Sequence, residues 1–179
     1  ISIATLGPEV ARRTITLLAP SKTFNIPGLG FSFAVIEDEE LRRRFQQTAE
    51  FIVPHPNMLG YTAAEAAYRD GGLWLEALLD YLRGNRDLVV DFVRERLPGV
   101  VTTVPEGTYL AWLDFSDVPL PPGVDPFRFC LEHAKVALND GVPFGAGGEG
   151  FTRLNFACPR ATLKAALEEI AQALETYCV

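Results

Sequence analysis

The first third of the chain combines apolar runs with turn-forming residues, a pattern that predicts two strands followed by a helix. The β-branched, apolar run at residues 14–19 predicts a buried strand, and residues 30–37 predict a second one. Asp38, which two glutamates follow, predicts the capped start of a helix that runs to about Phe51. Two strands and a helix leave apolar edges exposed, so we expect this part of the chain to belong to a larger sheet.

The middle of the chain has apolar residues at helical spacing. Thr62 and Glu65 have the spacing of a capping box, which predicts a helix start. Residues 69–72, Arg-Asp-Gly-Gly, interrupt that helix. A long helix follows, with Gly84 as a weak point, and the Pro-Gly pair at 98–99 ends it. Its apolar face is formed by Leu75, Leu78, Leu79, Leu82, Val89, Val93 and Leu97.

The last third predicts a compact α+β unit. Residues 100–104 and 108–115 predict two strands of a hairpin, and residues 151–158 predict a further strand. The aromatic residues of the second strand are expected in the core. The Asp-Pro pair at 125–126 predicts the start of a helix that runs to about Leu138. A final helix carries its apolar face at Leu163, Leu167, Ile170 and Leu174.

The composition predicts a folded protein with a sizeable core, because 48% of its 179 residues are hydrophobic and 22% are charged. A net charge of −7 argues against binding to nucleic acid or to an anionic membrane. No apolar run reaches the roughly 18 residues of a membrane-spanning helix, and the first residues lack the pattern of a signal peptide, so we expect neither feature. Three widely spaced cysteines indicate reduced, mostly buried thiols, so we expect a cytoplasmic protein. They are Cys130, Cys158 and Cys178.

Lys22 is one of only three lysines in the chain, and its position is unusual. It follows an apolar run, lies in a turn rich in proline and glycine, and has Glu9 and Glu37 as its nearest acidic residues in sequence. A lysine without a local counter-charge suits attack on a carbonyl group. The alternative is a surface lysine whose aliphatic stem lies on apolar neighbours.

Arg153 and Asn155 share one face of a predicted strand, and apolar residues occupy the other face. An arginine on a rigid strand suits bidentate capture of a carboxylate; the alternative is an ordinary solvent-facing position. The preceding glycine-rich loop, residues 144–150, does not match a dinucleotide-binding fingerprint, because it precedes a strand instead of opening a helix. We expect a flexible or close-approach loop near Arg153. His55 and His133 are isolated, so neither a catalytic triad nor a metal site is predicted.

Three segments, in this order, resemble fold-type I pyridoxal-phosphate enzymes. APSKTFNIPGL, residues 19–29, resembles their cofactor-lysine segment, and GTYLAWLDF, residues 107–115, and GEGFTRLNFACPR, residues 148–160, resemble their small domain. The resemblance covers essentially the whole chain. The nearest branch is the cystathionine β-lyase-like, cysteine C–S lyase branch of the class I/II aminotransferases.

The resemblance implies an α/β fold: the C-terminal part of a PLP-dependent transferase (aminotransferase-like) with an α+β small domain. Residues 1–55 would be the end of the large domain, residues 56–98 the linking helices, and residues 99–179 the small domain. The groups that hold the cofactor's phosphate, ring and ring nitrogen precede the lysine in this family and would lie outside this chain. The chain alone is therefore expected to be a poor catalyst.

The resemblance also implies roles for three residues. Lys22 would form the Schiff base with pyridoxal 5′-phosphate and, once released by substrate, take the Cα proton as general base. Ser21 would help to hold the phosphate, although Ala19 stands where many relatives have serine. Arg153 would bind the α-carboxylate of the substrate. No metal is implied.

The implied activity is β-elimination at a C–S bond of an amino-acid substrate, which yields pyruvate, ammonia and a thiol. A cytoplasmic homodimer is implied as well. Two alternatives stay open: a class I/II aminotransferase, for example of histidinol-phosphate or aromatic type, and a non-catalytic domain that keeps the scaffold.

Overall fold

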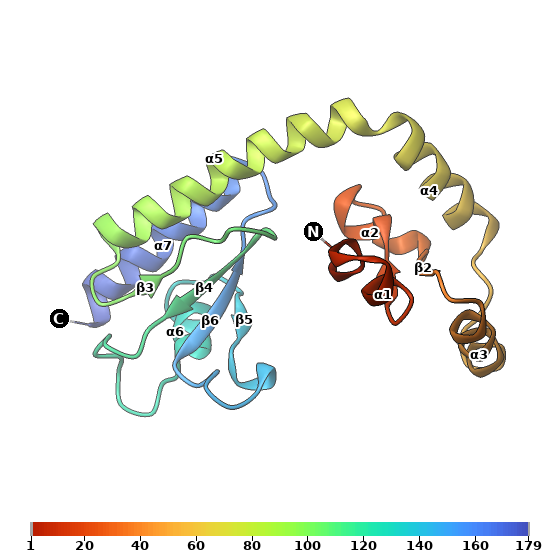
Figure 1. Ribbon diagram of the computed structural model, residues 1–179. Helices are drawn as coiled ribbons and strands as arrows, with labels where there is room; N and C mark the ends of the chain where they lie inside the picture. The colour runs from red at the N-terminus through yellow and green to blue at the C-terminus, as the bar shows by residue number, and fades with distance from the viewer. Residues whose placement is uncertain (1, 179) are drawn as a thin grey trace. The chain divides into compact units, whose positions relative to one another are not determined.

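The computed structural model describes residues 2–178 and shows a mixed α/β protein, which confirms the predicted fold class. The chain divides into two compact units, Ile1–Ala77 and Leu78–Val179, and the division falls within the long helix α5, Gly72–Arg96. The boundaries at residues 55 and 98 stay a prediction. Figure 1 labels most of the helices and strands of each unit. Among residues 2–178, no helix has both the length and the apolar character needed to cross a membrane.

The first unit contains a two-stranded antiparallel sheet and several helices. Register pairs Ile15 with Ile36 and Leu18 with Phe33. The elements before the long helix are η1 Ile3–Leu6, α1 Pro8–Ala11, β1 Ile15–Leu18, α2 Pro20–Thr23, η2 Pro27–Leu29, β2 Phe33–Ile36, α3 Glu39–Ala49 and α4 Met58–Asp70.

The strand at β1 is confirmed, but its predicted burial is wrong for this structure. Leu17 is 68% exposed and Val35, on the neighbouring strand, is 53% exposed. Within residues 2–77, Ile36 and Ala64 are the buried aliphatic side chains. A two-stranded sheet is too small to enclose the apolar residues of both its faces, and this is the physical reason for the difference.

The caps of α3 and α4 show where sequence patterns succeed and fail. The Asp38 carboxylate accepts a hydrogen bond from the backbone N–H of Leu41 at 2.8 Å, which confirms the predicted start of α3. The predicted start of α4 at Thr62 is wrong, because Asn57 caps the helix by accepting a bond from the N–H of Gly60 at 2.7 Å. Thr62 lies inside the helix, where its hydroxyl donates to the carbonyl of Met58.

The second unit is a four-stranded antiparallel sheet with the order β3-β4-β6-β5. The long helix α5 and the final helix α7 lie side by side over one face of this sheet (Figure 1). After α5 the elements are β3 Val101–Thr102, β4 Leu110–Asp114, α6 Pro126–Glu132, β5 Asn139–Asp140, η3 Val142–Phe144, β6 Phe151–Asn155 and α7 Arg160–Tyr177.

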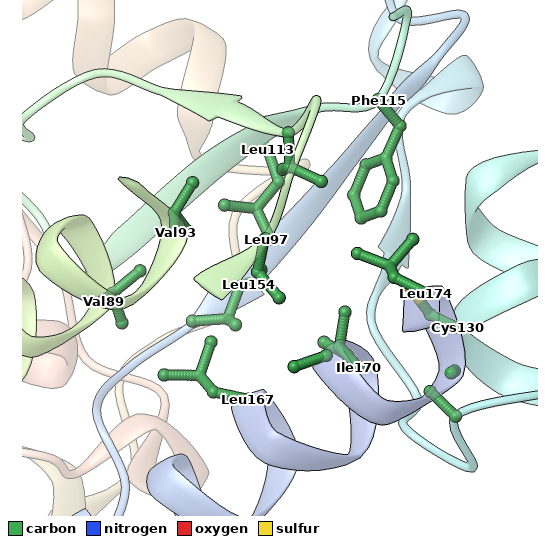
Figure 2. Packing of buried hydrophobic residues seen from close by; sticks show 14 of the residues in the cluster. Val89, Val93, Leu97, Leu113, Phe115, Cys130, Leu154, Leu167, Ile170 and Leu174 are labelled. Carbon is green, nitrogen blue, oxygen red and sulfur yellow. The ribbon is translucent and has the colours of Figure 1, made fainter. Parts of the chain in front are cut away.

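Helices and strands of the second unit meet in one continuous hydrophobic cluster. Figure 2 shows Val89 and Val93 of α5 close to Leu113 of β4, Leu154 of β6 and Leu167 of α7. The apolar face predicted for α7 is confirmed, because its four residues are at most 3% exposed. This core fixes the position of β6 and of the residues on its opposite face.

The helix that begins at Pro126 is shorter than predicted. Asp125 caps it through the N–H of Arg128, as expected, but it ends at Glu132 and not near Leu138. Lys135 adopts a left-handed conformation with φ +59°, which lets the chain leave the helix without a glycine. The chain then continues to β5, an unpredicted strand that pairs with β6.

A buried polar cluster joins α5 to the start of α7. The fully buried Asn85 donates hydrogen bonds to the carbonyls of Phe156, at 2.9 Å, and Cys158, at 3.0 Å. Its side-chain oxygen accepts a bond from Nε of Arg160 at 2.9 Å. Gly84 makes room for this arginine, because a Cβ there would lie 2.6 Å from its Nη2 atom. The predicted weak point of the helix is therefore a close-packing position.

Candidate cofactor-lysine and carboxylate sites

Lys22 lies in α2, a single helical turn that follows β1 directly. Pro20, the first residue of this turn, is buried, whereas the Lys22 side chain is exposed. Within residues 2–178 its amine has neither an ion-pair nor a hydrogen-bond partner. Ser21 precedes it in the same turn and is half-buried. The structure therefore brings Lys22 and Ser21 together and leaves the amine available to a ligand.

The turn that carries Lys22 is closed by a left-handed residue. Asn25 has φ +54°, and the N–H of Ile26 donates to the carbonyl of Ser21 at 3.0 Å. This arrangement ends a helix and reverses the chain. Farther along, the carbonyl of Leu29 accepts a bond from the side-chain amide of Asn57 at 2.8 Å. The cap of α4 thus also holds the segment that follows Lys22.

A row of aromatic side chains packs the Lys22 segment against α4. Phe24 contacts Tyr68 edge-on with ring centroids 5.6 Å apart, and lies beside Trp74 at 6.3 Å. Phe31 contacts Tyr61 at 5.8 Å, and Phe33 contacts Tyr68 at 6.0 Å. Edge-to-face pairs of this kind add about 0.5–1.5 kcal/mol each beyond their buried area. These contacts, and not a deep core, hold the turn.

Arg153 lies on β6, on the face of the sheet opposite the core. It pairs in register with Trp112 on one side and Asn139 on the other. Its Nη2 atom donates to the side-chain oxygen of Asn139 at 3.0 Å, and its guanidinium carbon lies 4.6 Å from the ring centroid of Phe144. Its Nε atom is closed to solvent and has no hydrogen-bond partner within residues 2–178.

An aromatic group borders Arg153 on this face. Trp112 stacks on Phe151 with centroids 5.4 Å apart and meets Phe144 edge-on at 5.5 Å. The expectation that this aromatic strand belongs to the core is wrong for Trp112, which alternates with the buried Ala111 and faces the other way. Its position between Ala111 and Leu113, which share the opposite face of the strand, was the signal that could have placed it on the Arg153 face.

The glycine-rich loop makes a close backbone approach, which confirms that expectation. A Cβ at Gly148 would lie 2.1 Å from the carbonyl oxygen of Gly141, and one at Gly141 would lie 2.2 Å from that of Gly148. Only glycines allow the two ends of the loop to meet in this way. The loop holds Phe144 against the Arg153 guanidinium.

The histidines and cysteines of the chain lie apart from Lys22 and Arg153 in sequence, and the structure gives each its own surroundings. His55 is exposed in a loop, and His133 packs against Tyr177 with ring centroids 4.4 Å apart. In residues 2–178, no group of three or more histidine, cysteine or acidic side chains could hold a metal ion. All three cysteines are free; Cys130 is buried, whereas Cys158 and Cys178 are only half-buried. Burial raises the pKa of the Cys130 thiol to about 12.

Lys22 belongs to the first unit and Arg153 to the second, so each defines a part-site within its own unit. Sequence reasoning selected both residues but missed Asn139 and Phe144, which are the direct neighbours of Arg153.

Known proteins resemble this chain in both sequence and fold. No family model matches it. It is 40% identical to the cystathionine beta-lyase PatB of Bacillus subtilis, over 96% of this chain and 44% of that protein. Cystalysin of Treponema denticola, whose crystal structure contains pyridoxal 5′-phosphate, has a TM-score of 0.88 and 34% identity over 96% of this chain and 43% of its own.

The PLP-bound C-S lyase of Staphylococcus hominis has a TM-score of 0.79 and 34% identity over 91% of this chain and 42% of its own. Aspartate aminotransferases also match, at lower identity. The chain spans less than half the length of the curated relatives that it matches. Sequence and fold together make it homologous to the C-terminal portion of the PLP-dependent, aminotransferase-like cystathionine β-lyases and C–S lyases.

Proposed function

We propose that the protein containing this chain is a pyridoxal-phosphate enzyme that cleaves the C–S bond of a sulfur-containing amino acid by β-elimination. With cystathionine or a cysteine conjugate and one water, the products are pyruvate, ammonia and a thiol. The observation that carries the proposal is the Lys22 amine, which has no ion-pair or hydrogen-bond partner within residues 2–178. It lies in a chain whose sequence matches a cystathionine β-lyase over 96% of its length.

The residues around Lys22 fit the cofactor in their chemistry. A primary amine without a partner is the group that links to an aldehyde, and the adjacent Ser21 hydroxyl would contact the phosphate. When bound, pyridoxal phosphate withdraws electrons from the Cα atom of a linked amino acid and makes its proton removable. Lys22 Nζ would accept that proton, after which the substrate's Cβ–S bond breaks.

Arg153 would orient the substrate through its α-carboxylate. A planar guanidinium presents paired donors that match the two oxygens of a carboxylate, which a lysine cannot do. Because β6 is anchored by the core on its other face, the position of this arginine would be well defined in the second unit. Orientation of this kind contributes to rate by restricting the substrate to one reactive geometry.

The proposal is tested with the complete gene product that contains these residues. The protein is loaded with pyridoxal phosphate and reduced with borohydride, and the labelled peptide is located by mass. We expect the label on Lys22 and pyruvate release from cystathionine. Lys22→Ala should lose the label and lower pyruvate release by about 10²- to 10⁴-fold. Lys164→Ala, which removes an exposed lysine from α7, should change neither.

The similarity to aspartate aminotransferases supports amino-group transfer as a second candidate. A Lys22 adduct together with transfer of the amino group to a keto acid, and without pyruvate release, would establish that candidate. Absence of a Lys22 adduct would overturn both and leave a non-catalytic domain. We also propose that the protein is cytoplasmic and forms a homodimer. Sedimentation of the complete product would test the homodimer.

A further inference from the structure

Three features of the second unit converge on the Arg153 side chain. Asn139 accepts a hydrogen bond from Nη2 at 3.0 Å, and the Phe144 ring lies under the guanidinium at 4.6 Å. The Nε atom is buried and unpaired among the described residues. Arg153 is only half-buried, yet one of its donors is withdrawn from water without a partner, so these contacts need an explanation.

The contacts come from two segments that reach Arg153 by independent routes. Asn139 belongs to β5 and is placed opposite Arg153 by the register of the β5–β6 pair. Phe144 lies in the loop whose two ends meet at Gly141 and Gly148. Trp112 then supports the Phe144 ring edge-on from β4. Both neighbours of the guanidinium are therefore held by backbone geometry.

The donors of Arg153 can be assigned one by one. A guanidinium has five N–H donors. One on Nη2 points to Asn139, and the single donor on Nε is closed to solvent. The second hydrogen of Nη2 and both hydrogens of Nη1 have no partner among the described residues. The edge formed by these two terminal nitrogens is the edge that a ligand can approach.

We propose that Asn139 and Phe144 are positioning residues that fix the Arg153 guanidinium, so that its terminal Nη1–Nη2 edge meets the carboxylate of the substrate. The inference rests on the proposed role of Arg153 in binding that carboxylate. Asn139 sets the rotation of the guanidinium plane by holding one donor. Phe144 holds the guanidinium over its ring by a cation–π contact.

The neutrality of Asn139 is part of this role. Asn139→Asp has nearly the same shape and accepts the same hydrogen bond, but it adds a negative charge next to Nη2. That charge forms an internal ion pair with Arg153 and competes with the ligand. A purely structural role predicts that this variant is as stable as the wild type or more so, with unchanged ligand binding. A positioning role predicts a stable protein that binds carboxylates poorly.

The test measures binding of propionate, a simple monocarboxylate, to the complete PLP-loaded gene product by ligand-observed NMR, with propionamide as the uncharged comparison. We expect propionate to bind more tightly than propionamide. Asn139→Ala should weaken propionate binding about 3- to 10-fold, and Asn139→Asp by more than 10-fold. Phe144→Leu should weaken it about 2- to 5-fold, and Phe144→Tyr, which keeps the ring, should restore it.

A matched control is available on the same sheet face. Asn155 lies two residues beyond Arg153 on β6, and its side-chain oxygen accepts a bond from the N–H of Ala157 at 2.9 Å. Asn155→Asp adds the same charge and keeps that bond, without a contact to the guanidinium. It should bind propionate within about twofold of the wild type.

The outcomes separate this inference from the proposed activity. Propionate binding by Asn139→Asp within twofold of the wild type would overturn the inference, and so would a wild type that does not prefer propionate to propionamide. A protein that binds propionate in an Asn139-dependent way but releases no pyruvate would support the inference and contradict the proposed activity. An active lyase in which Asn139→Ala raises KM with an unchanged kcat would support both.

Discussion

Replacement of Asn85 tests whether one buried side chain fastens α5 to the start of α7. Asn85 is fully buried and makes three hydrogen bonds, two to backbone carbonyls and one to the charged Arg160 side chain. The orientation of its amide follows from these partners, because only a nitrogen facing the carbonyls and an oxygen facing the arginine satisfies all three.

The expected cost of Asn85→Ala follows from these contacts. Each bond to a carbonyl contributes about 1 kcal/mol, and a bond to a charged group about 1.5–3 kcal/mol. Arg160 is only half-buried and also contacts Tyr81, so it can recover part of its loss from water. We therefore expect the free energy of unfolding of the second unit to fall by about 3–4 kcal/mol.

The assay is urea unfolding of a Trp74→Phe background, in which Trp112 reports on the second unit. Asn155→Ala serves as the control, because it removes one exposed hydrogen bond and should cost about 1 kcal/mol or less. Asn85→Asp keeps the acceptor for Arg160 but turns an oxygen toward the two carbonyls, so it should destabilise at least as strongly as alanine. If Asn85→Ala and Asn155→Ala differ by less than about 1 kcal/mol, the cluster does not fasten the helices.

Two further predictions concern the glycine loop and the buried thiol. Gly148→Ala places a Cβ 2.1 Å from the carbonyl oxygen of Gly141 and should open the loop, which lowers both thermal stability and propionate binding. Gly107→Ala places its Cβ in open space and should change neither. Equal effects of the two variants would show that the loop does not hold Phe144. For Cys130, folding raises the thiol pKa from 9.0 to about 12, so the thiol of the unfolded state loses its proton first as the pH rises. The free energy of unfolding therefore falls between these pH values, by up to about 1.4 kcal/mol per pH unit. Unfolding of Cys130→Ala should lack this alkaline slope, and an identical slope in both proteins would contradict the assignment.

Local sequence signals predicted helix starts well where one side chain decides them. Asp38 and Asp125 each precede a helix and accept the expected backbone bond. The start predicted at Thr62 was wrong because the spacing of Thr62 to Glu65 also fits a capping box. Asn57 caps the helix instead, by accepting a bond from the N–H of Gly60, and it also donates a bond to the carbonyl of Leu29. That second bond is non-local, so no pattern within the helix could reveal it.

The surroundings of Arg153 show the same limit at a functional site. Strand alternation placed Arg153 on the face opposite Leu154, and the structure confirms this. Asn139 was expected just beyond a helix, because nothing local announces that Lys135 adopts a left-handed conformation and ends it early. The pairing of β5 with β6 decides where Asn139 lies, and the free energy of that pairing depends on contacts between residues that are distant in sequence.

The two part-sites differ in what holds them, and this has a consequence for function. Arg153 lies on a strand whose other face is sealed by the core of the second unit, so a local change on α5 or α7 reaches it only by disturbing that core. Lys22 lies on a single turn held by Asn25, by the bond from Asn57 and by aromatic contacts to α4. Because those contacts are few and partly exposed, the position of the Lys22 amine should depend far more than that of Arg153 on individual side chains of α4.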